Sequence, residues 1–165
     1  MVYFNGDRLG INAQIAAGAD TVQIFDSWIG CLSEAHYRRY VLPHMRTIFS
    51  QLDRSVPSIY FGTGNPRLYG AMSEAGGDVI GVDWRISLSD AWQAIGSDRA
   101  IMGNLDPAAI LATRDAMFAQ TQAVLDDAGG RTGHVFNLGH GIMPGAKVDQ
   151  VRALVDYVHE RSSGQ

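Results

Sequence analysis

The chain has 165 residues, of which 46% are apolar and 18% charged, and its formal net charge is −4 at pH 7. This composition indicates one folded domain rather than a disordered chain, and its acidic balance argues against nucleic-acid binding. A single cysteine, Cys31, excludes a disulfide framework and a multi-cysteine zinc site. No apolar run approaches the roughly 18 residues of a membrane helix, and residues 1–10 lack a signal-peptide pattern. We therefore expect a cytoplasmic protein that binds neither nucleic acid nor membrane.

Five short apolar segments, rich in β-branched residues, predict β-strands. Each has four or five residues and is apolar at nearly every position, which favours strands buried on both faces, as in a parallel sheet. Longer helical patterns separate them, so the order predicts right-handed βαβ crossovers in one undivided α/β domain. The predicted strands are residues 21–25, 58–61, 79–82, 100–103 and 134–137.

The first two intervening segments carry clear helix signals. Ser33 is placed to cap a helix from Glu34 to about Asp53, which Pro43 should kink or divide. The next helix starts at residues 65–66, an asparagine followed by proline, and ends at two glycines, 76–77.

The remaining helices are predicted by the same kind of signal. Ser87 or Ser89 caps a short helix that ends at Gly96, residues 106–107 start another, and Thr113 starts a longer one. The longer helix stops at residues 129–130, and a last amphipathic helix runs from about 147 to 161. The apolar stripe of that last helix consists of Val148, Val151, Leu154, Val155 and Val158.

Small or polar residues follow each predicted strand directly. The carboxyl ends of parallel strands lie at one edge, which is the ligand-binding face of α/β proteins. Glycines there let the backbone approach a ligand or take positive φ, which accounts for part of the high count of 19 glycines. These segments are residues 26–28, 62–65, 83–85, 104–107 and 137–141.

Several of these polar residues have an ordinary structural role as an alternative. Asp26 and Asp83 are as consistent with a structural role, in which they cap a turn or bind backbone amides, as with a role at a ligand site. Asp106, directly before a proline, fits a helix cap better than a catalytic acid. Asn104 and Asn137 fit residues that tie neighbouring loops together as well as residues that touch a ligand.

His140 is a candidate catalytic residue. It lies between Gly139 and Gly141, where the backbone is bare and the imidazole has few local neighbours. Near neutral pH a histidine can donate a hydrogen bond or carry a proton, although a structural histidine is the alternative. Trp28 and Trp84 either wall an aromatic pocket or pack at the edge of the fold.

Several kinds of site have no support in the sequence. No GxGxxG or GxxxxGK[ST] motif follows a strand, so nucleotide-phosphate loops are not predicted. A GxSxG elbow and an HExxH motif are also missing, and no His/Cys cluster supplies three metal ligands. We therefore predict no metal site and no cofactor.

Five stretches resemble the uroporphyrinogen decarboxylase family in residues, order and spacing. They are AGADTVQIFDSWIGCLS (17–33), FGTGNPRLYGAM (61–72), EAGGDVIGVDW (74–84), GNLDP (103–107) and HVFNLGHGIMP (134–144). The resemblance runs from about Ile11 to Arg161. GNLDP and NLGHG together are quite specific, whereas either motif alone would be weak.

The resemblance implies a parallel α/β fold of the TIM-barrel (βα)₈ class. It also implies a carboxy-lyase of porphyrin and haem synthesis that removes carboxyl groups from the four acetate side chains of uroporphyrinogen to give coproporphyrinogen. No metal or organic cofactor is implied, because a protonated pyrrole ring of the substrate can serve as the electron sink. The protein then has to orient the substrate and supply a proton.

Three site residues follow from the resemblance. Ser27 matches the hydroxyl residue that hydrogen-bonds a substrate carboxylate, and His140 matches the histidine that faces the substrate. Phe25 matches a pocket-lining aromatic residue. The family's substrate-binding arginines, the aspartate that gathers the pyrrole NH groups and an active-site tyrosine have no counterpart in these 165 residues.

The resemblance therefore predicts a partial barrel of about five βα units, corresponding to strands four to eight. Residues 1–10 fit the family poorly, residues 11–162 form the barrel part and residues 163–165 are a tail. A complete eight-stranded barrel takes about 250 residues. We expect the isolated chain to be inactive, and we expect either a homodimer, as in the full-length family, or a separate amino-terminal half as its partner.

Two other hypotheses stay open. One is a methyltransferase of the same superfamily acting on corrinoid or thiol substrates, which would hold zinc through His and Cys ligands. Against it, NLGHG contains no cysteine and Cys31 stands alone. The other is a non-catalytic half-barrel that pairs with a separate amino-terminal chain or dimerises to cover its edges.

Overall fold

The computed structural model describes residues 8–96 and 98–162. The predicted tail, residues 163–165, and most of the predicted start segment, residues 1–10, lie outside the described residues. The first helix, α1 (Arg8–Ala16), crosses the predicted boundary at residue 10. This helix was not predicted from the sequence, although its buried Ile11 and Ile15 have helical spacing.

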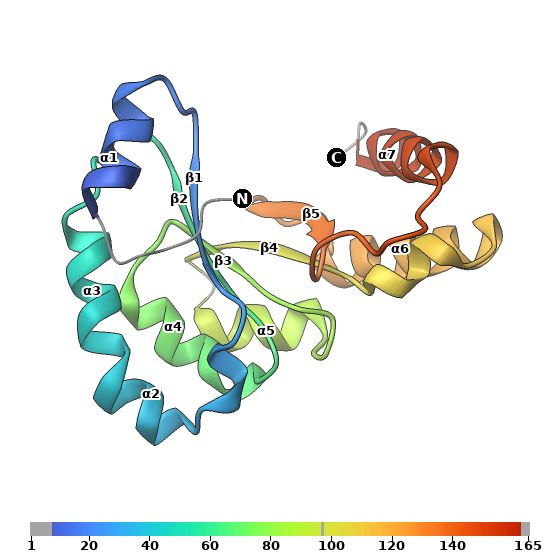
Figure 1. The fold of residues 1–165 in the computed structure, drawn as a ribbon. Coiled ribbons are helices and arrows are strands. Elements are labelled where there is room, and N and C mark those ends of the chain that lie inside the picture. The colour runs from blue at the N-terminus through green and yellow to red at the C-terminus, as the bar shows by residue number, and fades with distance from the viewer. Residues whose placement is uncertain (1–7, 97, 163–165) are drawn as a thin grey trace.

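Five parallel strands form one sheet whose spatial order follows the sequence. All five coincide with predicted strands within two residues at each end. Helices cover one face of the curved sheet, and no helix of the described part covers the other (Figure 1). This confirms the predicted partial barrel of five βα units. The strands are β1 (Val22–Asp26), β2 (Ser58–Gly62), β3 (Val79–Gly81), β4 (Ala100–Leu105) and β5 (His134–Leu138).

The helices begin and end where the capping signals predict. Ser33 accepts a hydrogen bond from the His36 amide at the start of α2 (Glu34–Tyr40), and α3 (Leu42–Ser50) begins just before Pro43. Pro43 thus divides one predicted helix into two. The short 3₁₀ helices after the first, second and fourth strands are η1 (Ile29–Cys31), η2 (Pro66–Leu68) and η3 (Pro107–Leu111).

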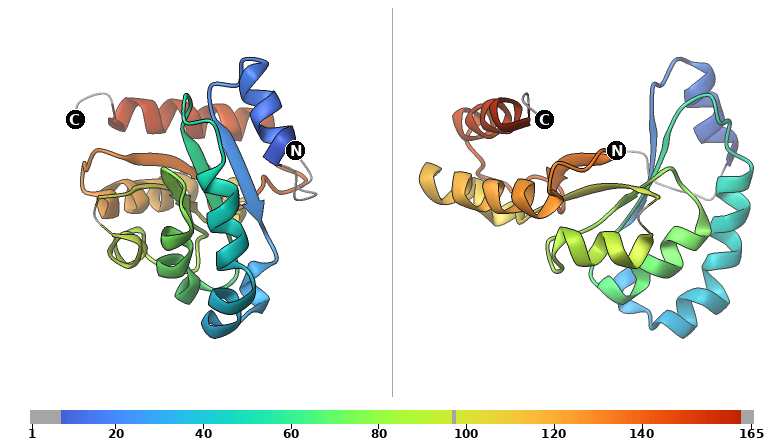
Figure 2. Two further views of the ribbon diagram at one scale, coloured as in Figure 1. Left: turned by 90° about the vertical axis from the view of Figure 1, so that its left-hand side faces the viewer. Right: turned by 180° about the vertical axis from the view of Figure 1, so that it is seen from behind.

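The later helices follow the same signals. Ser87, rather than Ser89, caps α5 (Leu88–Ile95), and Thr113 caps α6 (Arg114–Ala128). The helix between β2 and β3, α4 (Tyr69–Ala75), ends at Gly76 as predicted. The last helix, α7 (Val148–Ser162), lies beside α6 beyond β5, as both views in Figure 2 show.

The core lies mainly between the convex face of the sheet and helices α1 to α5. A second cluster fills the space between β5, η3, α6 and α7, and a third lies on the concave face of the sheet. The concave cluster consists of Ile59, Phe61, Val79 and Met102, with Ala100 packed against it.

Two predictions about burial are wrong in part. The two outer strands are not buried on both faces, since Phe25 is 48% exposed and Val135 is 46% exposed on the concave side. In the stripe of α7, Leu154 is buried, whereas Val148 and Val155 remain exposed. The physical reason is the same in both cases, because no described element covers the concave face or the far side of β5.

The described part of the chain contains no candidate membrane-spanning helix. None of the helices in residues 8–96 and 98–162 combines the length and the apolar character required to cross a bilayer.

Candidate active site at the carboxyl ends of the strands

The predicted site residues lie at the carboxyl ends of the two outermost strands. Phe25 is the next-to-last residue of β1 and Ser27 directly follows that strand, while His140 follows β5. All three side chains are exposed. The Ser27 hydroxyl and the His140 ring make no hydrogen bond with any residue that the structure describes. Both are therefore available to a ligand.

A chain of aromatic contacts connects Phe25 with His140 across the concave face. The rings of Phe25 and Phe61 meet edge to face with centroids 5.9 Å apart. His140 lies edge to face against Phe61 at 6.4 Å and against Trp84 at 6.3 Å. The loop after β5 is thus brought to the ends of β2 and β3. Ser27 makes no described contact with this group and is placed near it only by β1.

The strand register explains how the rings come together. Phe25, Phe61, Gly81 and Met102 are partners across neighbouring strands and form one row on the concave face. A side chain at Gly81 would place a Cβ 2.9 Å from the Phe61 ring and 3.1 Å from the Met102 methyl group. Glycine at this position therefore leaves room for the central phenylalanine of the row.

Gly139 sets the position of His140. Its amide donates a 2.7 Å hydrogen bond to the Leu105 carbonyl, and a Cβ there would lie only 2.6 Å from the Trp84 backbone nitrogen. A residue with a side chain could not approach the β3 loop this closely. By contrast, a Cβ at Gly141 would meet nothing within 4 Å. The two glycines that flank His140 therefore have different roles.

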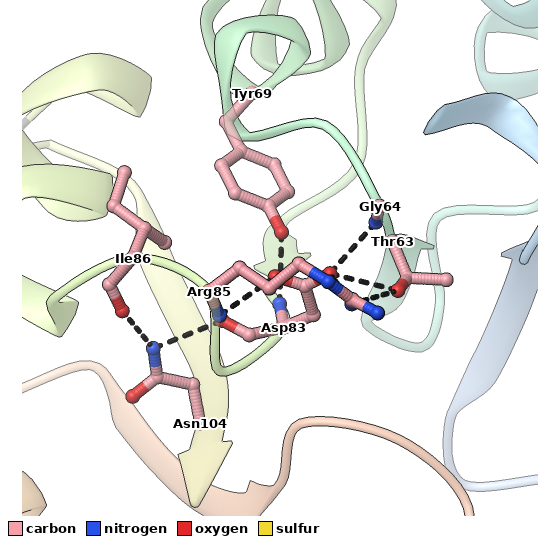
Figure 3. Close-up of polar contacts among 7 residues, drawn as sticks. All are labelled: Thr63, Gly64, Tyr69, Asp83, Arg85, Ile86 and Asn104. Carbon is pink, nitrogen blue, oxygen red and sulfur yellow. Dashed lines mark hydrogen bonds and ion pairs between the residues drawn. The ribbon is translucent and has the colours of Figure 1, made fainter. Parts of the chain in front are cut away.

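Asp83 is a fully buried carboxylate that ties the loops after β2 and β3 together (Figure 3). It accepts hydrogen bonds from the Gly64 amide at 2.7 Å, the Thr63 hydroxyl at 2.8 Å and the Arg85 amide at 3.0 Å. The Arg85 guanidinium adds an ion pair at 2.6 Å. Burial alone would raise the pKa of Asp83, but these donors together hold the pKa below its ordinary value.

This network resolves the role of Asp83 that the sequence left open. The carboxylate binds backbone amides and a neighbouring cation, and its own amide donates to the Tyr69 hydroxyl at 2.8 Å. Its oxygens thus face protein donors rather than the concave face. Asp83 supports the loops of the site.

Two other polar residues also have structural roles. The Asn104 side-chain amide donates to the carbonyls of Asp83 at 3.0 Å and Ile86 at 2.8 Å, so it ties neighbouring loops together. Asp106 accepts from the Ala108 amide and caps η3, as predicted. Asn137 differs, because it is exposed and its side-chain hydrogen bonds go to the Met102 sulfur and to the amide of Leu138 in its own strand.

Asp26 is oriented away from the concave face. Its carboxylate accepts a 3.1 Å hydrogen bond from the Tyr60 hydroxyl, which lies 3.2 Å from the Tyr37 hydroxyl of α2. Burial raises the pKa of Asp26 above its ordinary value despite the Tyr60 hydrogen bond. Burial likewise raises the pKa of Tyr37 to about 12. The Asp26 carboxylate thus binds a side-chain hydroxyl. This differs from the two structural roles considered for it, capping a turn and binding backbone amides.

Phe61 and Arg85 are candidate site residues that were not predicted from the sequence. Phe61 lies inside a predicted strand, and only its register with Phe25 shows that it shares the concave face. Arg85 was noted as a polar residue after β3, but its guanidinium stacks over the Trp84 ring at 4.0 Å. Alternation along β2 could have identified Phe61, whereas nothing in the sequence fixes the stacking of Arg85.

The described residues offer no ready metal site. In residues 8–96 and 98–162, no three His, Cys, Asp or Glu side chains are grouped closely enough to hold an ion. What the carboxyl end of the sheet does offer is an apolar aromatic surface, one imidazole and one hydroxyl. Such a surface can pack against a flat or bowl-shaped ring system while the polar groups orient its substituents.

Comparison with known proteins supplies the family. A sequence model of uroporphyrinogen decarboxylase (URO-D) matches residues 10–161. "Uroporphyrinogen decarboxylase" of Sorangium cellulosum is 53% identical over 150 residues, which cover 90% of this chain and 43% of that protein. The protein of the same name from Streptomyces coelicolor is 50% identical over 164 residues, or 95% of this chain and 46% of the relative. The chain thus spans under half the length of these relatives.

A solved structure shows the same fold. A methyltransferase from Methanosarcina mazei superposes with a TM-score of 0.79 and covers 92% of this chain and 45% of that one. Its sequence identity is 22%, so this likeness concerns the fold alone. The extent of the family match and the identity to the two relatives are decisive, and the chain belongs to the uroporphyrinogen decarboxylase family.

Proposed function

We propose that this chain is the carboxyl-terminal part of a uroporphyrinogen decarboxylase and that its concave face holds one side of the tetrapyrrole. The observation that carries the proposal is the placement of His140, Phe61 and Phe25 on one continuous surface, in a chain about 50% identical to decarboxylases. Phe25 and His140 expose their rings, and the buried Phe61 joins them from beneath. The exposed rings suit the pyrrole rings, because a pyrrole can stack on them or meet them edge-on.

The proposed reaction needs an electron sink for the pair of electrons in the carbon–carboxylate bond. Protonation of a pyrrole ring of the substrate makes that ring an acceptor. The acetate side chain then loses CO₂ and its bonding electrons enter the ring, which leaves an exocyclic methylene group. Addition of a proton to the methylene group and loss of the proton that the ring had gained restore the pyrrole and leave a methyl group. In the net reaction a carboxylate group is replaced by hydrogen, one proton is consumed and one CO₂ is released, so no redox partner is needed.

We assign the steps to the two polar residues of the concave face. His140 is proposed as the proton-bearing group, because an imidazole exchanges protons near neutral pH and His140 is exposed beside Phe61. Ser27 is proposed to donate a hydrogen bond to a substrate carboxylate. The remaining groups are proposed to come from the amino-terminal region of the complete barrel.

A covalent fusion tests this proposal. The region of the Sorangium cellulosum relative that precedes the matched segment is joined ahead of residue 10 of this chain. The fusion is incubated with uroporphyrinogen under argon, and the products are separated by their number of carboxyl groups. We expect stepwise conversion to coproporphyrinogen by the fusion and none by the isolated chain. A folded fusion without product would contradict the proposed activity, and robust turnover by the isolated chain would contradict the assignment of essential groups to the missing region.

A further inference from the structure

Arg85 is a cation that lies against the aromatic surface of the proposed site. It follows β3, and its guanidinium lies 4.0 Å over the ring of Trp84, which itself contacts His140. The side chain of Arg85 is 44% exposed, whereas that of its partner Asp83 has no exposed surface. One end of this ion pair is therefore enclosed and the other is open to a ligand.

The hydrogen bonds of the Arg85 guanidinium to Asp83 and Thr63 both involve Nη1. Nη1 donates to Asp83 at 2.6 Å and lies 3.3 Å from the Thr63 hydroxyl, as Figure 3 shows. An arginine has five N–H donors in a planar fork, and Nε and Nη2 carry three of them. These three donors are not used in the contacts with Asp83 and Thr63. The planar fork matches the two oxygens of a carboxylate.

The contacts with Trp84 and Asp83 preorganise Arg85 for binding an anion. An arginine loses rotamer freedom when it binds a ligand, and this loss weakens binding by surface arginines. Stacking on Trp84 and the ion pair with Asp83 already restrict the Arg85 side chain before any ligand arrives. Three donors other than the guanidinium, which are the Thr63 hydroxyl and the Gly64 and Arg85 amides, also bind Asp83, so the carboxylate remains compensated when the guanidinium shares its charge.

We propose that Arg85 binds a carboxylate side chain of the tetrapyrrole at the edge of the aromatic surface, and thereby helps to orient the rings against His140. This inference rests on the proposed function, because it takes a polycarboxylate ring system as the ligand. It adds a cationic contact from this part of the barrel to the contacts that the family resemblance assigns to other regions. Arg85 is a binding residue in this proposal and takes no part in proton transfer.

Calorimetric titration of the 165-residue chain with uroporphyrinogen under argon tests the proposal. We expect Arg85→Met to weaken binding by about 10-fold or more, the loss that corresponds to roughly 1.5–3 kcal/mol for a hydrogen bond to a charged group. Arg54→Met is the matched control, since it removes the same charge from an exposed position at the amino ends of the strands. We expect its affinity to stay within about twofold of wild type, because exposed charges contribute little at a distance in moderate salt.

A double variant separates ligand binding from support of Asp83. If Arg85 only neutralises Asp83, then Arg85→Met combined with Asp83→Asn removes both charges and should restore the affinity. If Arg85 binds the ligand, the double variant stays as weak as Arg85→Met. Wild-type affinity in the single variant, or recovery in the double variant, overturns the proposal.

A measurement on the wild-type chain covers the case in which the variants do not fold. Phenylglyoxal modifies exposed arginines, and peptide mass spectrometry reports the rate at each position. We expect uroporphyrinogen to slow the modification of Arg85 several-fold and to leave Arg54 unchanged. Equal rates at Arg85 with and without uroporphyrinogen overturn the proposal for Arg85. The fusion assay judges the decarboxylase activity separately, so product formation with an unprotected Arg85 refutes this inference alone.

Discussion

Asp26, at the end of β1, and Asp83, after β3, are two carboxylates with opposite effects on stability, and they lie on either side of β2. Hydrogen bonds and Arg85 lower the pKa of Asp83, whereas burial raises the pKa of Asp26. A carboxylate with a lowered pKa stabilises the fold above its unfolded pKa of 3.8, and this contribution disappears as the pH falls through its folded value. A carboxylate with a raised pKa lowers the stability at neutral pH.

Asparagine substitutions should therefore change stability in opposite directions. We expect Asp83→Asn to lower the free energy of unfolding at pH 7 by at least about 2 kcal/mol, since three donors lose a charged acceptor. The loss should shrink below pH 3.8, where the wild-type carboxylate becomes protonated on unfolding. Asp26→Asn should raise stability at pH 7 and have no effect at low pH. Urea denaturation at pH 7 and pH 3 measures both, and equal losses of stability for the two variants would contradict the assignment.

His140 should matter for turnover more than for folding. We expect His140→Ala in the fusion to lower kcat by about 100-fold, a typical effect for loss of a general acid or base. Its effect on the unfolding temperature should be small, because the ring is exposed. His44→Ala on α3 is the matched control and should change neither quantity. If His140→Ala unfolds the protein, the structural interpretation of this histidine is correct.

Ser27 should act through substrate binding. One hydrogen bond to a carboxylate contributes about 1.5–3 kcal/mol, so Ser27→Ala should raise KM about 10-fold or more. The order in which the acetate groups are lost should also change, because the ring system is held less firmly. Steady-state kinetics and the distribution of partly decarboxylated products measure these effects. Unchanged kinetics would remove Ser27 from the site.

At the scale of elements, the loop after β5 depends on a close approach to the loop after β3. We expect Gly139→Ala to lower stability by about 1–3 kcal/mol, the usual cost of an overpacked position, because its Cβ would lie 2.6 Å from the Trp84 nitrogen. Gly141→Ala is the matched control on the other side of His140, where a Cβ meets open space. Thermal unfolding of both variants checks this, and equal shifts in Tm would contradict the role given to Gly139.

Local signals in the sequence predicted the elements well because caps and prolines act through their own backbone neighbours. Ser33, Thr113 and Pro43 determine helix boundaries by hydrogen bonds or steric conflict within one turn. The exposed positions in α7 were not predictable in this way. An apolar stripe shows that a helix can bury one face, but only the neighbouring elements decide whether Val148 and Val155 are covered.

The candidate site was predictable only in part for a related reason. His140 was selected because of its flanking glycines and its match to a family motif, and Phe25 because of the family match. The contact of His140 with Phe61 and Trp84 joins segments that are far apart in the sequence. Such contacts depend on strand register and loop path, which residue patterns alone do not determine.

At the scale of the whole molecule, the described sheet is an open part of a barrel. β1 and β5 each have one edge without a strand partner among the described residues, and the concave face beside them exposes Phe25 and Val135. Unpaired strand edges and exposed apolar groups favour association with another segment. The relatives contain more than half of their length beyond the matched region, and we propose that this region closes the barrel.

The rate of coproporphyrinogen formation by the fusion, compared with that of the intact Sorangium cellulosum relative, tests the central claim most directly. We predict a rate within about 10-fold of the relative, which corresponds to roughly 1.4 kcal/mol in activation free energy. This result would show that the 165-residue chain supplies a functional carboxyl-terminal part of the barrel. A folded fusion whose rate equals that of the uncatalysed reaction would contradict the claim.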